Sequence, residues 1–376
     1  MVSTRLPVRA AIIGCGVIGP THAKALSLDG RAGFVLACDV DPAAAARLGA
    51  PRTSADWRDA LDPSIDLVCV CTPHHLHAEQ VVAALAAGKH VLCEKPLATT
   101  PDDVRRMVDA SALAEKRGVV ASGVFQHRFS PLVRRLHELV RGGDFGAVHS
   151  GDMTVRCKRT EAYYASGPWR GKWAGEGGGL MINQAIHTLD LMNWFCGRVV
   201  SVAGTVERRK VRTIEVEDWA EATVRYAPEH GSSGAVGTLR AENDLATDWQ
   251  NTVTIRLAHG SFTIGNGNRL THIEHPSAAL CAELRAFDQI HLDGCKLPGK
   301  ECYGDHHALQ VQDVLGAIVG GRAPFVRLAD AAQSAQTVLA LYHSAATGGA
   351  VVTLTAPGFR RPTLALASAA AFAEQA

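Results

Sequence analysis

The order of apolar and polar residues divides the chain into two parts, the first of which extends to about residue 126. In this part, short apolar runs alternate with amphipathic segments, as expected when strands and helices follow one another. Because right-handed helical crossovers join parallel strands, the pattern predicts an α/β fold with a doubly wound parallel sheet. Strands are expected at 8–13, 33–39, 65–73, 89–96 and 119–125, with helices at 77–88 and 101–118.

The pattern changes after Gln126. An amphipathic helix that ends at Gly142–Gly143 precedes alternating runs separated by glycine-rich turns, which predicts a large open, mostly antiparallel sheet. We expect a first domain at 1–126 and an α+β domain at 127–376, whose C-terminal tail can return to the first. An open sheet covered by helices on one side leaves an apolar face to bury, so a homo-oligomer is expected. Strands are expected at 146–157, 199–208, 216–226, 234–242 and 250–257, with helices at 178–195, 306–321 and 328–346.

Charge and composition narrow the classes of partner. The 376 residues include 38 basic and 37 acidic side chains, and no long run of one sign indicates a nucleic-acid arm or a membrane-surface patch. No segment approaches the roughly 20 apolar residues of a membrane span, and the N-terminal apolar segment is too short for a signal peptide. We therefore expect a cytoplasmic protein with neither nucleic-acid nor membrane partners.

Cysteine and histidine side chains are the candidate metal ligands of the sequence. Several of the 10 cysteines lie inside apolar runs, which is typical of reduced cysteine used as a small hydrophobic residue. Cys69 and Cys71 share one face of their strand, but no second pair follows at zinc-site spacing. His74, His75 and His77 lie on a strand-to-helix turn, where their side chains splay apart. We therefore expect no metal.

A glycine-rich turn after the first strand indicates a nucleotide cofactor. Gly14, Gly16 and Gly19 form G-x-G-x-x-G between a strand and a helix. In Rossmann folds the first glycine permits a tight turn, the second lets the backbone approach a pyrophosphate, and the third lets helix and strand pack closely. Asp39 ends the second strand, where a carboxylate accepts hydrogen bonds from ribose hydroxyls and repels the 2′-phosphate of NADP. We therefore expect NAD, with NADP the less favoured cofactor.

Further cofactor contacts are expected at the carboxyl ends of the parallel strands, where ligands bind in such sheets. Lys95 lies at one of these ends, directly before Pro96. A lysine there can hydrogen-bond a substrate oxygen, and its ammonium stabilises alkoxide character as hydride leaves carbon. From spacing alone, Lys95 can equally be a solvated loop residue. The expected cofactor-binding residues are Gly14, Gly16, Val17, Ile18, Gly19, Asp39, Thr72, Pro73, His77, Glu94 and Lys95.

A polar stripe on an apolar helix marks a second candidate site. Asn183, His187 and Asp190 share one face of the helix expected at 178–195, which is otherwise apolar. Buried polar groups need partners, and a ligand cavity can supply them. The alternative is a structural histidine held by Asp190 or by a backbone carbonyl.

The loop before this helix offers aromatic and cationic side chains. Aromatic faces stack on the C–H faces of a polyhydroxylated ring, and long donors pair with its hydroxyls. The loop, residues 163–179, can equally pack across a subunit boundary. The candidate substrate-binding residues are Lys95, Arg128, Arg156, Trp169, Arg170, Asn183, His187 and His307.

Three stretches together resemble the Gfo/Idh/MocA family, the relatives of glucose–fructose oxidoreductase and inositol dehydrogenase. They are "GCGVIGPTHAKAL", "CTPHHLHAEQVVAALAAGKHVLCEKPLA" and "GEGGGLMINQAIHTLDLMNWFCG", and the match runs from residue 8 to about 355. The resemblance implies a nucleotide-binding first domain and an open-sheet second domain that forms dimers or tetramers. It also implies a catalytic lysine, carried onto Lys95, and a catalytic histidine, carried onto His187.

Asn183 departs from many members of the family, which have aspartate at this position. Asparagine cannot take a proton, but it can orient a hydroxyl or polarise a carbonyl. His187 and Lys95 then remain as the proton-handling pair, and either can be the acceptor. Asp190 is expected to hold His187 or to pack the helix.

These observations predict an NAD-dependent oxidoreductase. It would act on a secondary alcohol, or its ketone, in a sugar, cyclitol or sugar derivative, with Lys95, His187 and Asn183 in the catalytic site. Two alternatives share the same residues. One is a non-catalytic, NAD-dependent regulatory or binding protein, and the other is an enzyme that oxidises its substrate transiently and recycles its NAD internally.

Overall fold

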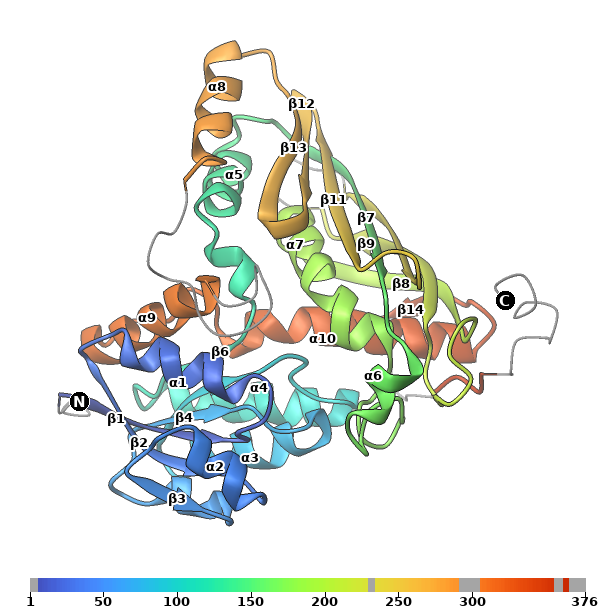
Figure 1. The fold of residues 1–376 in the computed structure, drawn as a ribbon. Helices are drawn as coiled ribbons and strands as arrows, with labels where there is room; N and C mark the ends of the chain where they lie inside the picture. The colour runs from blue at the N-terminus through green and yellow to red at the C-terminus, as the bar shows by residue number, and fades with distance from the viewer. Residues whose placement is uncertain (1–5, 229–233, 291–304, 355–360, 365–376) are drawn as a thin grey trace. The chain divides into compact units, whose positions relative to one another are not determined.

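The computed structural model describes residues 6–228, 234–290, 305–354 and 361–364, which divide into two compact units (Figure 1). The first unit contains the described residues within 1–98, 102–129 and 291–332, and the second contains those within 99–101, 130–290 and 333–376. The sequence placed the boundary after residue 126, whereas the first unit extends to Phe129 and takes up the chain again around 305–332. Cys295 and Cys302 lie outside the described residues.

The first unit is built on a six-stranded parallel sheet in the order β3-β2-β1-β4-β5-β6, which confirms the predicted Rossmann fold. The order reverses between β1 and β4, the switch point at which such sheets bind ligands. The short edge strand β3 was not predicted, because three residues are too few to show a periodic pattern. The strands are β1 (Val8–Ile13), β2 (Ala32–Cys38), β3 (Arg52–Ser54), β4 (Leu67–Val70), β5 (His90–Cys93) and β6 (Ala121–Gly123).

Helices pack on both faces of this sheet because alternate strand residues point to opposite sides. Leu67 and Cys69 of β4 share an apolar core with α1 and α9, whereas Val68 and Val70 point to the face on which α3 packs. Asp41 caps α2 as expected, since its carboxylate accepts a hydrogen bond from the Ala43 N–H. The helices are α1 (Gly19–Ser27), α2 (Pro42–Arg47), α3 (His77–Ala86), α4 (Pro101–Glu115) and α9 (Asp305–Gly320).

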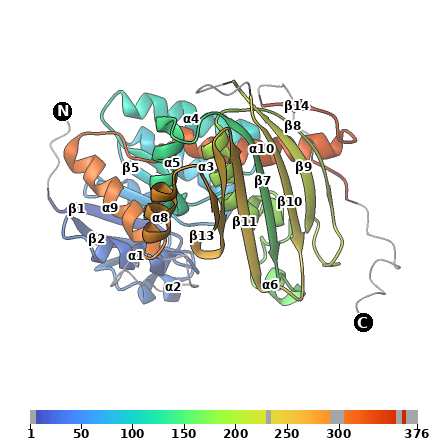
Figure 2. The same ribbon diagram turned by 90° about the horizontal axis from the view of Figure 1, so that it is seen from above.

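The second unit contains an eight-stranded sheet in the order β13-β12-β11-β7-β10-β9-β8-β14 (Figure 2). Its neighbouring strands pair antiparallel except β7 and β10, so the prediction of a mostly antiparallel sheet is confirmed. The strands β12, β13 and β14 were not predicted. The strands are β7 (Val148–Cys157), β8 (Val199–Glu207), β9 (Trp219–Tyr226), β10 (Val236–Asn243), β11 (Trp249–Leu257), β12 (Gly260–Gly265), β13 (Arg269–Glu274) and β14 (Val352–Thr353).

One apolar helix, α7, covers one face of this sheet and packs on β7, β10 and β11. It continues from a π-helical turn at Met181–Ala185, a distortion that is frequent at functional sites. Met153 and Val155 of β7 are buried toward α7, and the alternate residues Asp152 and Thr154 point the other way. The helices are α5 (Pro131–Gly142), α6 (Glu161–Ala165), α7 (Ile186–Cys196), α8 (Ala278–Phe287) and α10 (Leu328–Ala346), which begins in the first unit.

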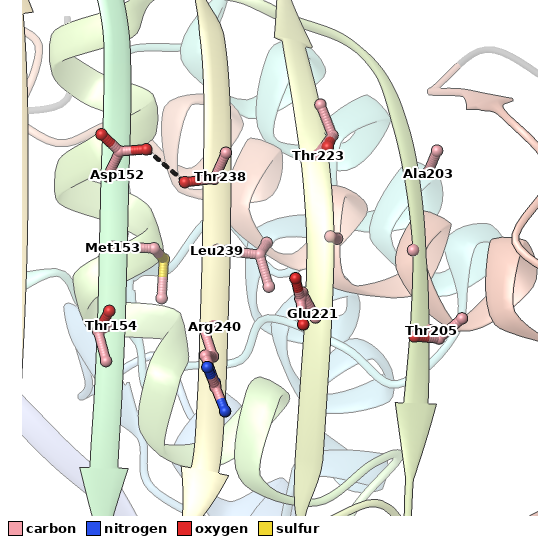
Figure 3. A pocket seen from close by; sticks show the side chains of 12 residues that line it. Asp152, Met153, Thr154, Ala203, Thr205, Glu221, Thr223, Thr238, Leu239 and Arg240 are labelled. Atoms are coloured by element: carbon pink, nitrogen blue, oxygen red, sulfur yellow. Dashed lines mark hydrogen bonds between the residues drawn. The ribbon is translucent and has the colours of Figure 1, made fainter.

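The sheet face opposite α7 carries a hollow of about 510 Å³ over β7, β8, β9 and β10 (Figure 3). Charged and hydroxyl side chains line it, including Asp152, Glu221, Thr238 and Arg240, and Asp152 pairs with Arg256. The expectation that this face is apolar was therefore wrong, because its outward strand positions are mainly polar. Among the helices that the structure describes, none has the length and apolar character needed to cross a membrane.

Candidate functional site

The glycine-rich turn has the geometry expected of a nucleotide cradle. Gly14 has a φ of +90°, and a Cβ atom there would lie 2.5 Å from the carbonyl oxygen of Cys71, so this position requires glycine. A Cβ at Gly16 would meet nothing within 4 Å, which leaves the backbone open to a close ligand. A Cβ at Gly19 would lie 2.9 Å from the Gly14 carbonyl oxygen, which explains the tight packing of α1 on the turn.

The residues between these glycines differ in exposure. Val17 is 88% exposed, and Ile18 packs against the apolar core under α1. The N-terminus of α1, beginning at Gly19 with Pro20 in its first turn, therefore follows an exposed turn. Backbone N–H groups at such an end are suited to an anionic pyrophosphate.

Asp39 lies directly after β2, beside the glycine turn. Its Oδ2 accepts a hydrogen bond of 2.7 Å from the Cys15 N–H, and its Oδ1 accepts one of 2.9 Å from the Asp41 N–H. These bonds fix the orientation of the carboxylate, and each oxygen retains acceptor capacity for a ribose hydroxyl. Asp39 therefore has the surroundings that the predicted ribose contact requires.

The loops after β4 and β5 are joined by His77. Its ring is fully buried, with Nδ1 2.8 Å from the Pro96 carbonyl oxygen and Nε2 2.8 Å from the Thr72 carbonyl oxygen. Burial lowers the pKa of His77. The Thr72 hydroxyl donates to Gln80 over 2.6 Å. His77 thus has a structural role that the sequence did not reveal, because both ring nitrogens face backbone oxygens.

Lys95 lies at the carboxyl end of β5, half-buried, and a cis peptide joins it to Pro96. Its backbone N–H donates to Glu94 Oε2 over 3.2 Å. The strand order therefore brings the glycine turn, Asp39, Thr72 and Lys95 to one edge of the sheet, at the ends of four adjacent strands. This is the edge that the sequence predicted for the cofactor.

Glu94 is the centre of a buried polar cluster that the sequence did not predict. His22 Nε2, from α1, lies 2.8 Å from Glu94 Oε1, and His307 Nε2, from α9, lies 3.5 Å from the same oxygen. The facing ligand atoms of the three side chains all lie within 4.8 Å of one another, a spacing that could also hold a metal ion. His307, a candidate for substrate binding, is 2% exposed and faces Glu94.

In the second unit, Asn183 lies in the π-helical turn and His187 in the first turn of α7, and both are buried. The Asn183 amide nitrogen donates to Glu176 Oε1 over 2.5 Å and to the Tyr163 hydroxyl over 3.3 Å. Asp190 accepts a hydrogen bond of 2.9 Å from the Ser334 hydroxyl of α10. That contact agrees with a packing role for Asp190.

Glu176 places a carboxylate beside Asn183, and the sequence analysis missed it. It is 1% exposed, its Oε2 accepts a hydrogen bond of 2.6 Å from the Gly171 N–H, and Arg170 Nη1 lies 3.8 Å from its Oε1. The sequence feature that could have indicated Glu176 is the single acidic residue inside the glycine-rich run "GEGGG". Position 183 itself carries no carboxylate, but the neighbouring carboxylate of Glu176 contacts the asparagine.

The loop at 163–179 packs back onto the start of this helix. Arg170 and Gln184 each donate to the Tyr163 hydroxyl over 2.8 Å. The Arg170 guanidinium also lies 4.4 Å from the centroid of the Trp169 ring. These contacts lie within the second unit, and they place Trp169 and Arg170 next to the turn that carries Asn183.

A second unpredicted acid, Glu217, binds the start of the same helix. Its carboxylate accepts hydrogen bonds of 2.8 Å from the Gly179 and Met181 N–H groups and one of 2.9 Å from the Tyr342 hydroxyl. Glu217 is completely buried, and burial outweighs these donors and raises its pKa to about 7. Through these hydrogen bonds, Glu217 provides acceptors for N–H groups at the start of the helix that have no partner within it.

The remaining arginine candidates lie in different surroundings. Arg128, in the first unit, is 5% exposed, and its guanidinium lies 5.8 Å from the centroid of the Phe125 ring. Arg156, in the second unit, points to the sheet face opposite α7 and pairs with Glu242 at 2.8 Å and Asp244 at 2.6 Å. The sheet therefore separates Arg156 from the helix that carries His187, which argues against its predicted contact with the substrate.

Known proteins agree with this architecture. The chain is 26% identical over 337 residues to levoglucosan dehydrogenase from Pseudarthrobacter phenanthrenivorans, covering 81% of this chain and 84% of the relative. It is 35% identical over 202 residues to D-glucoside 3-dehydrogenase from Escherichia coli, covering 52% of this chain and 55% of that relative's length. The solved structure of the WlbA dehydrogenase from Bordetella pertussis with NADH and UDP-GlcNAcA has a TM-score of 0.82 at 28% identity, covering 94% of this chain and 99% of that one.

Both units match a family description. Residues 8–123 match "Oxidoreductase family, NAD-binding Rossmann fold", and residues 133–263 match the Gfo/Idh/MocA C-terminal domain. Together the two matches cover most of the described chain and follow the division between its units. The protein therefore belongs to the Gfo/Idh/MocA family of NAD-binding oxidoreductases.

Proposed function

We propose that the protein is an NAD-dependent dehydrogenase or reductase that acts on a secondary alcohol, or its ketone, in a sugar, cyclitol or sugar derivative. The observation that carries this proposal is the sheet edge of the first unit, where the open turn at Gly16, the oriented carboxylate of Asp39 and the half-buried Lys95 lie at the ends of neighbouring strands. The similar proteins named as levoglucosan and D-glucoside dehydrogenases support a sugar-like substrate.

Different residues of the chain would bind the cofactor and accept the proton of the substrate. Gly14, Gly16, Gly19 and Asp39 would hold NAD, which accepts hydride from the substrate carbon when bound. In the oxidation direction the alcohol proton passes to the imidazole of His187 or to Lys95. When His187 is the base, the Lys95 ammonium would stabilise negative charge on the substrate oxygen as the carbonyl forms. When Lys95 is the base, its neutral amine would take the proton. The hydride would carry away two electrons and one proton, and the second proton would leave through the base.

Asn183 orients the substrate in this proposal, and Glu176 determines which atoms the amide can offer. Because the amide nitrogen donates to Glu176 and to Tyr163, its oxygen is the group that would accept a substrate hydroxyl. Trp169 and Arg170 lie on the adjoining loop, where an aromatic face and a cation suit a polyhydroxylated ring.

The test is a panel of sugars, inositols and acidic or amino sugars, with NADH fluorescence as the readout. We expect the wild type to reduce NAD with at least one member of the panel. Lys95→Ala and His187→Ala should each lower turnover by about 10²-fold, whereas NAD binding should stay within about threefold. Tight NAD binding with no redox exchange across the panel would support a binding protein instead. Product formation without net NADH would support internal recycling of the cofactor.

We also propose a cytoplasmic homodimer or homotetramer formed through the sheet face opposite α7. The hollow over β7 to β10 is the surface on which a partner would sit (Figure 3), and its charged residues would pair with those of a second copy. The eight cysteines among the described residues are free thiols, as expected in a reducing compartment. Light scattering of the wild type and of a Thr238→Arg variant tests the assembly, and an unchanged oligomer in the variant would contradict this surface.

A further inference from the structure

Glu94 lies between two helices of the first unit and the loop that begins at Lys95. Its backbone directly follows β5, and its N–H donates to the Val70 carbonyl oxygen over 2.9 Å. Its side chain reaches away from the sheet edge to His22 of α1 and His307 of α9. The centroids of the two imidazole rings lie 5.7 Å apart, and the rings pack edge to face. The carboxylate therefore has an imidazole on two sides.

The charge on Glu94 is maintained by this enclosure. A buried carboxylate is costly unless hydrogen bonds and an opposite charge compensate it. Burial alone would raise the pKa of Glu94, but bonding to His22 and His307 lowers it well below its usual range. Burial would likewise lower the pKa of His22, yet Cys71 and then Glu94, which both face its ring, raise it above its ordinary value. Since Cys71 beside it has a pKa of about 12 and stays a thiol, Glu94 is the negative partner.

The second oxygen of Glu94 faces the backbone of Lys95. Glu94 Oε2 accepts the Lys95 N–H over 3.2 Å, while Oε1 faces the two imidazoles. Rotation of the carboxylate would break both sets of contacts together. On the other side of Lys95, Nδ1 of the buried His77 ring lies 2.8 Å from the Pro96 carbonyl oxygen. The lysine therefore lies between two backbone groups that buried side chains contact.

We infer that Glu94 is a positioning residue for Lys95, and that His22 and His307 hold its carboxylate in the orientation that fixes the Lys95 backbone. The inference rests on the proposed catalytic role of Lys95. It gives His307 and Glu94 roles inside the first unit in place of the substrate contact and the cofactor contact that the sequence suggested for them. The 2.8 Å contact between His22 and Glu94 is a hydrogen bond in its own right, which favours an ion cluster over a metal site.

The test is a double-mutant cycle between Glu94→Gln and Lys95→Ala. Glutamine keeps the size of the side chain but removes its charge. We expect Glu94→Gln alone to lower turnover by about 10- to 100-fold, because small misplacements of a catalytic group have effects of this size, while the Kd for NAD changes less than about threefold. In the Lys95→Ala background the same substitution should change the residual turnover by less than about twofold, because the group it positions is gone.

Two outcomes would overturn the inference. One is wild-type turnover in Glu94→Gln, and the other is an equal loss in both backgrounds, which would show that Glu94 acts independently of Lys95. Normal turnover in Lys95→Ala would instead contradict the proposed function. The two failures are therefore distinguishable.

Controls separate positioning from general stability and from metal binding. His90 is buried at the opposite end of β5, where its Nδ1 accepts the Val120 N–H over 2.9 Å. His90→Gln should lower the melting temperature and leave turnover within about twofold. If Glu94→Gln does not fold, His22→Gln takes its place in the cycle and should show the same dependence on Lys95. Loss of activity on dialysis against a chelator, restored by Zn²⁺, would make the histidines ligands and overturn the inference.

Discussion

Two buried glutamates, one in each unit, lie next to the residues proposed for catalysis and have opposite electrostatic states. Glu94 precedes Lys95 and faces two imidazoles, which lower its pKa well below the usual range. Glu217 binds the start of the helix that carries Asn183, and it faces two backbone N–H groups and the Tyr342 hydroxyl. Its pKa is raised to about 7 because burial outweighs these neutral donors.

The difference shows that the partner, rather than the depth of burial, sets the charge of a buried carboxylate. A protonated imidazole supplies a full positive charge at hydrogen-bond distance, whereas amide and hydroxyl groups supply partial charges. The first unit therefore holds a permanent anion beside Lys95. The second holds a carboxylate that ionises near neutral pH at the start of its helix.

The largest effect is expected when a second carboxylate enters the second unit beside Glu176, whose ion-pair partner there is Arg170. Asn183→Asp removes the donor that lies 2.5 Å from Glu176 and places two carboxylates side by side. Because an uncompensated buried charge costs about 3–5 kcal/mol, we expect a marked fall in melting temperature and at least a 10-fold loss of turnover. Thermal unfolding and NADH formation measure the two effects.

The control for this substitution is the double variant Glu176→Gln/Asn183→Asp. It exchanges the carboxylate and amide positions and should recover most of the lost stability. An Asn183→Asp variant as stable and active as the wild type would show that the second unit tolerates paired acids and that neighbouring charge is not decisive there.

The next effect is a pH dependence from Glu217. Its folded pKa of about 7 lies above the unfolded value of about 4.3, so the folded state binds more protons between these values. Stability is then lost as pH rises through that interval, by roughly 3–4 kcal/mol. Glu217→Gln should gain stability relative to the wild type between about pH 5 and pH 8, as followed by the melting temperature.

Glu94→Gln should show the opposite trend. A lowered folded pKa contributes stability above the unfolded value, and that contribution is lost as pH falls through the folded value. The variant should therefore be less stable than the wild type near neutral pH and approach it in acid. Parallel pH profiles for the two glutamine variants would contradict the contrast between the glutamates.

A smaller effect is expected at the ribose contact proposed for Asp39. Asp39→Ala removes the carboxylate that backbone N–H groups of the turn orient, so NAD binding should weaken by about 10-fold, the scale of one or two hydrogen bonds to a charged group. Without the repulsion of a 2′-phosphate, the preference for NAD over NADP should narrow. Titration with both cofactors tests this, and an unchanged preference would move the ribose contact elsewhere.

The smallest effect is expected for Arg156→Ala. Its guanidinium pairs with Glu242 and Asp244 on the sheet face opposite α7. Removing it should leave kcat/KM for the substrate within about threefold, because exposed ion pairs contribute little. A large rise in KM in this variant would show instead that Arg156 contacts the substrate.

The first unit could be predicted from its sequence because its signals are local. The three glycines, the acid after the second strand and the lysine before proline each have a proposed role that depends on a few residues at one strand end. The structure gives each glycine a distinct physical reason, from the positive φ of Gly14 to the close contact at Gly19. The strand β3 was missed because it is short.

The two glutamate sites could not be predicted, because their partners are remote in sequence. His22 and Glu94 are separated by 72 positions, and Glu217 and Tyr342 by 125. No local pattern connects such pairs before the fold is known. The expectation of an apolar open sheet face was wrong for a related reason. Periodicity shows which residues alternate along a strand, but it does not show which face of the sheet the helix covers.

The most direct test of the account is a double-mutant cycle between Lys95 and His187, measured as turnover on a substrate found in the panel. Residues that act as a unit on one reacting centre are strongly non-additive. We predict that Lys95→Ala/His187→Ala turns over no more than about threefold more slowly than the slower single variant. Losses that simply multiply would show that the two residues act independently, and the proposed chemistry would then be wrong.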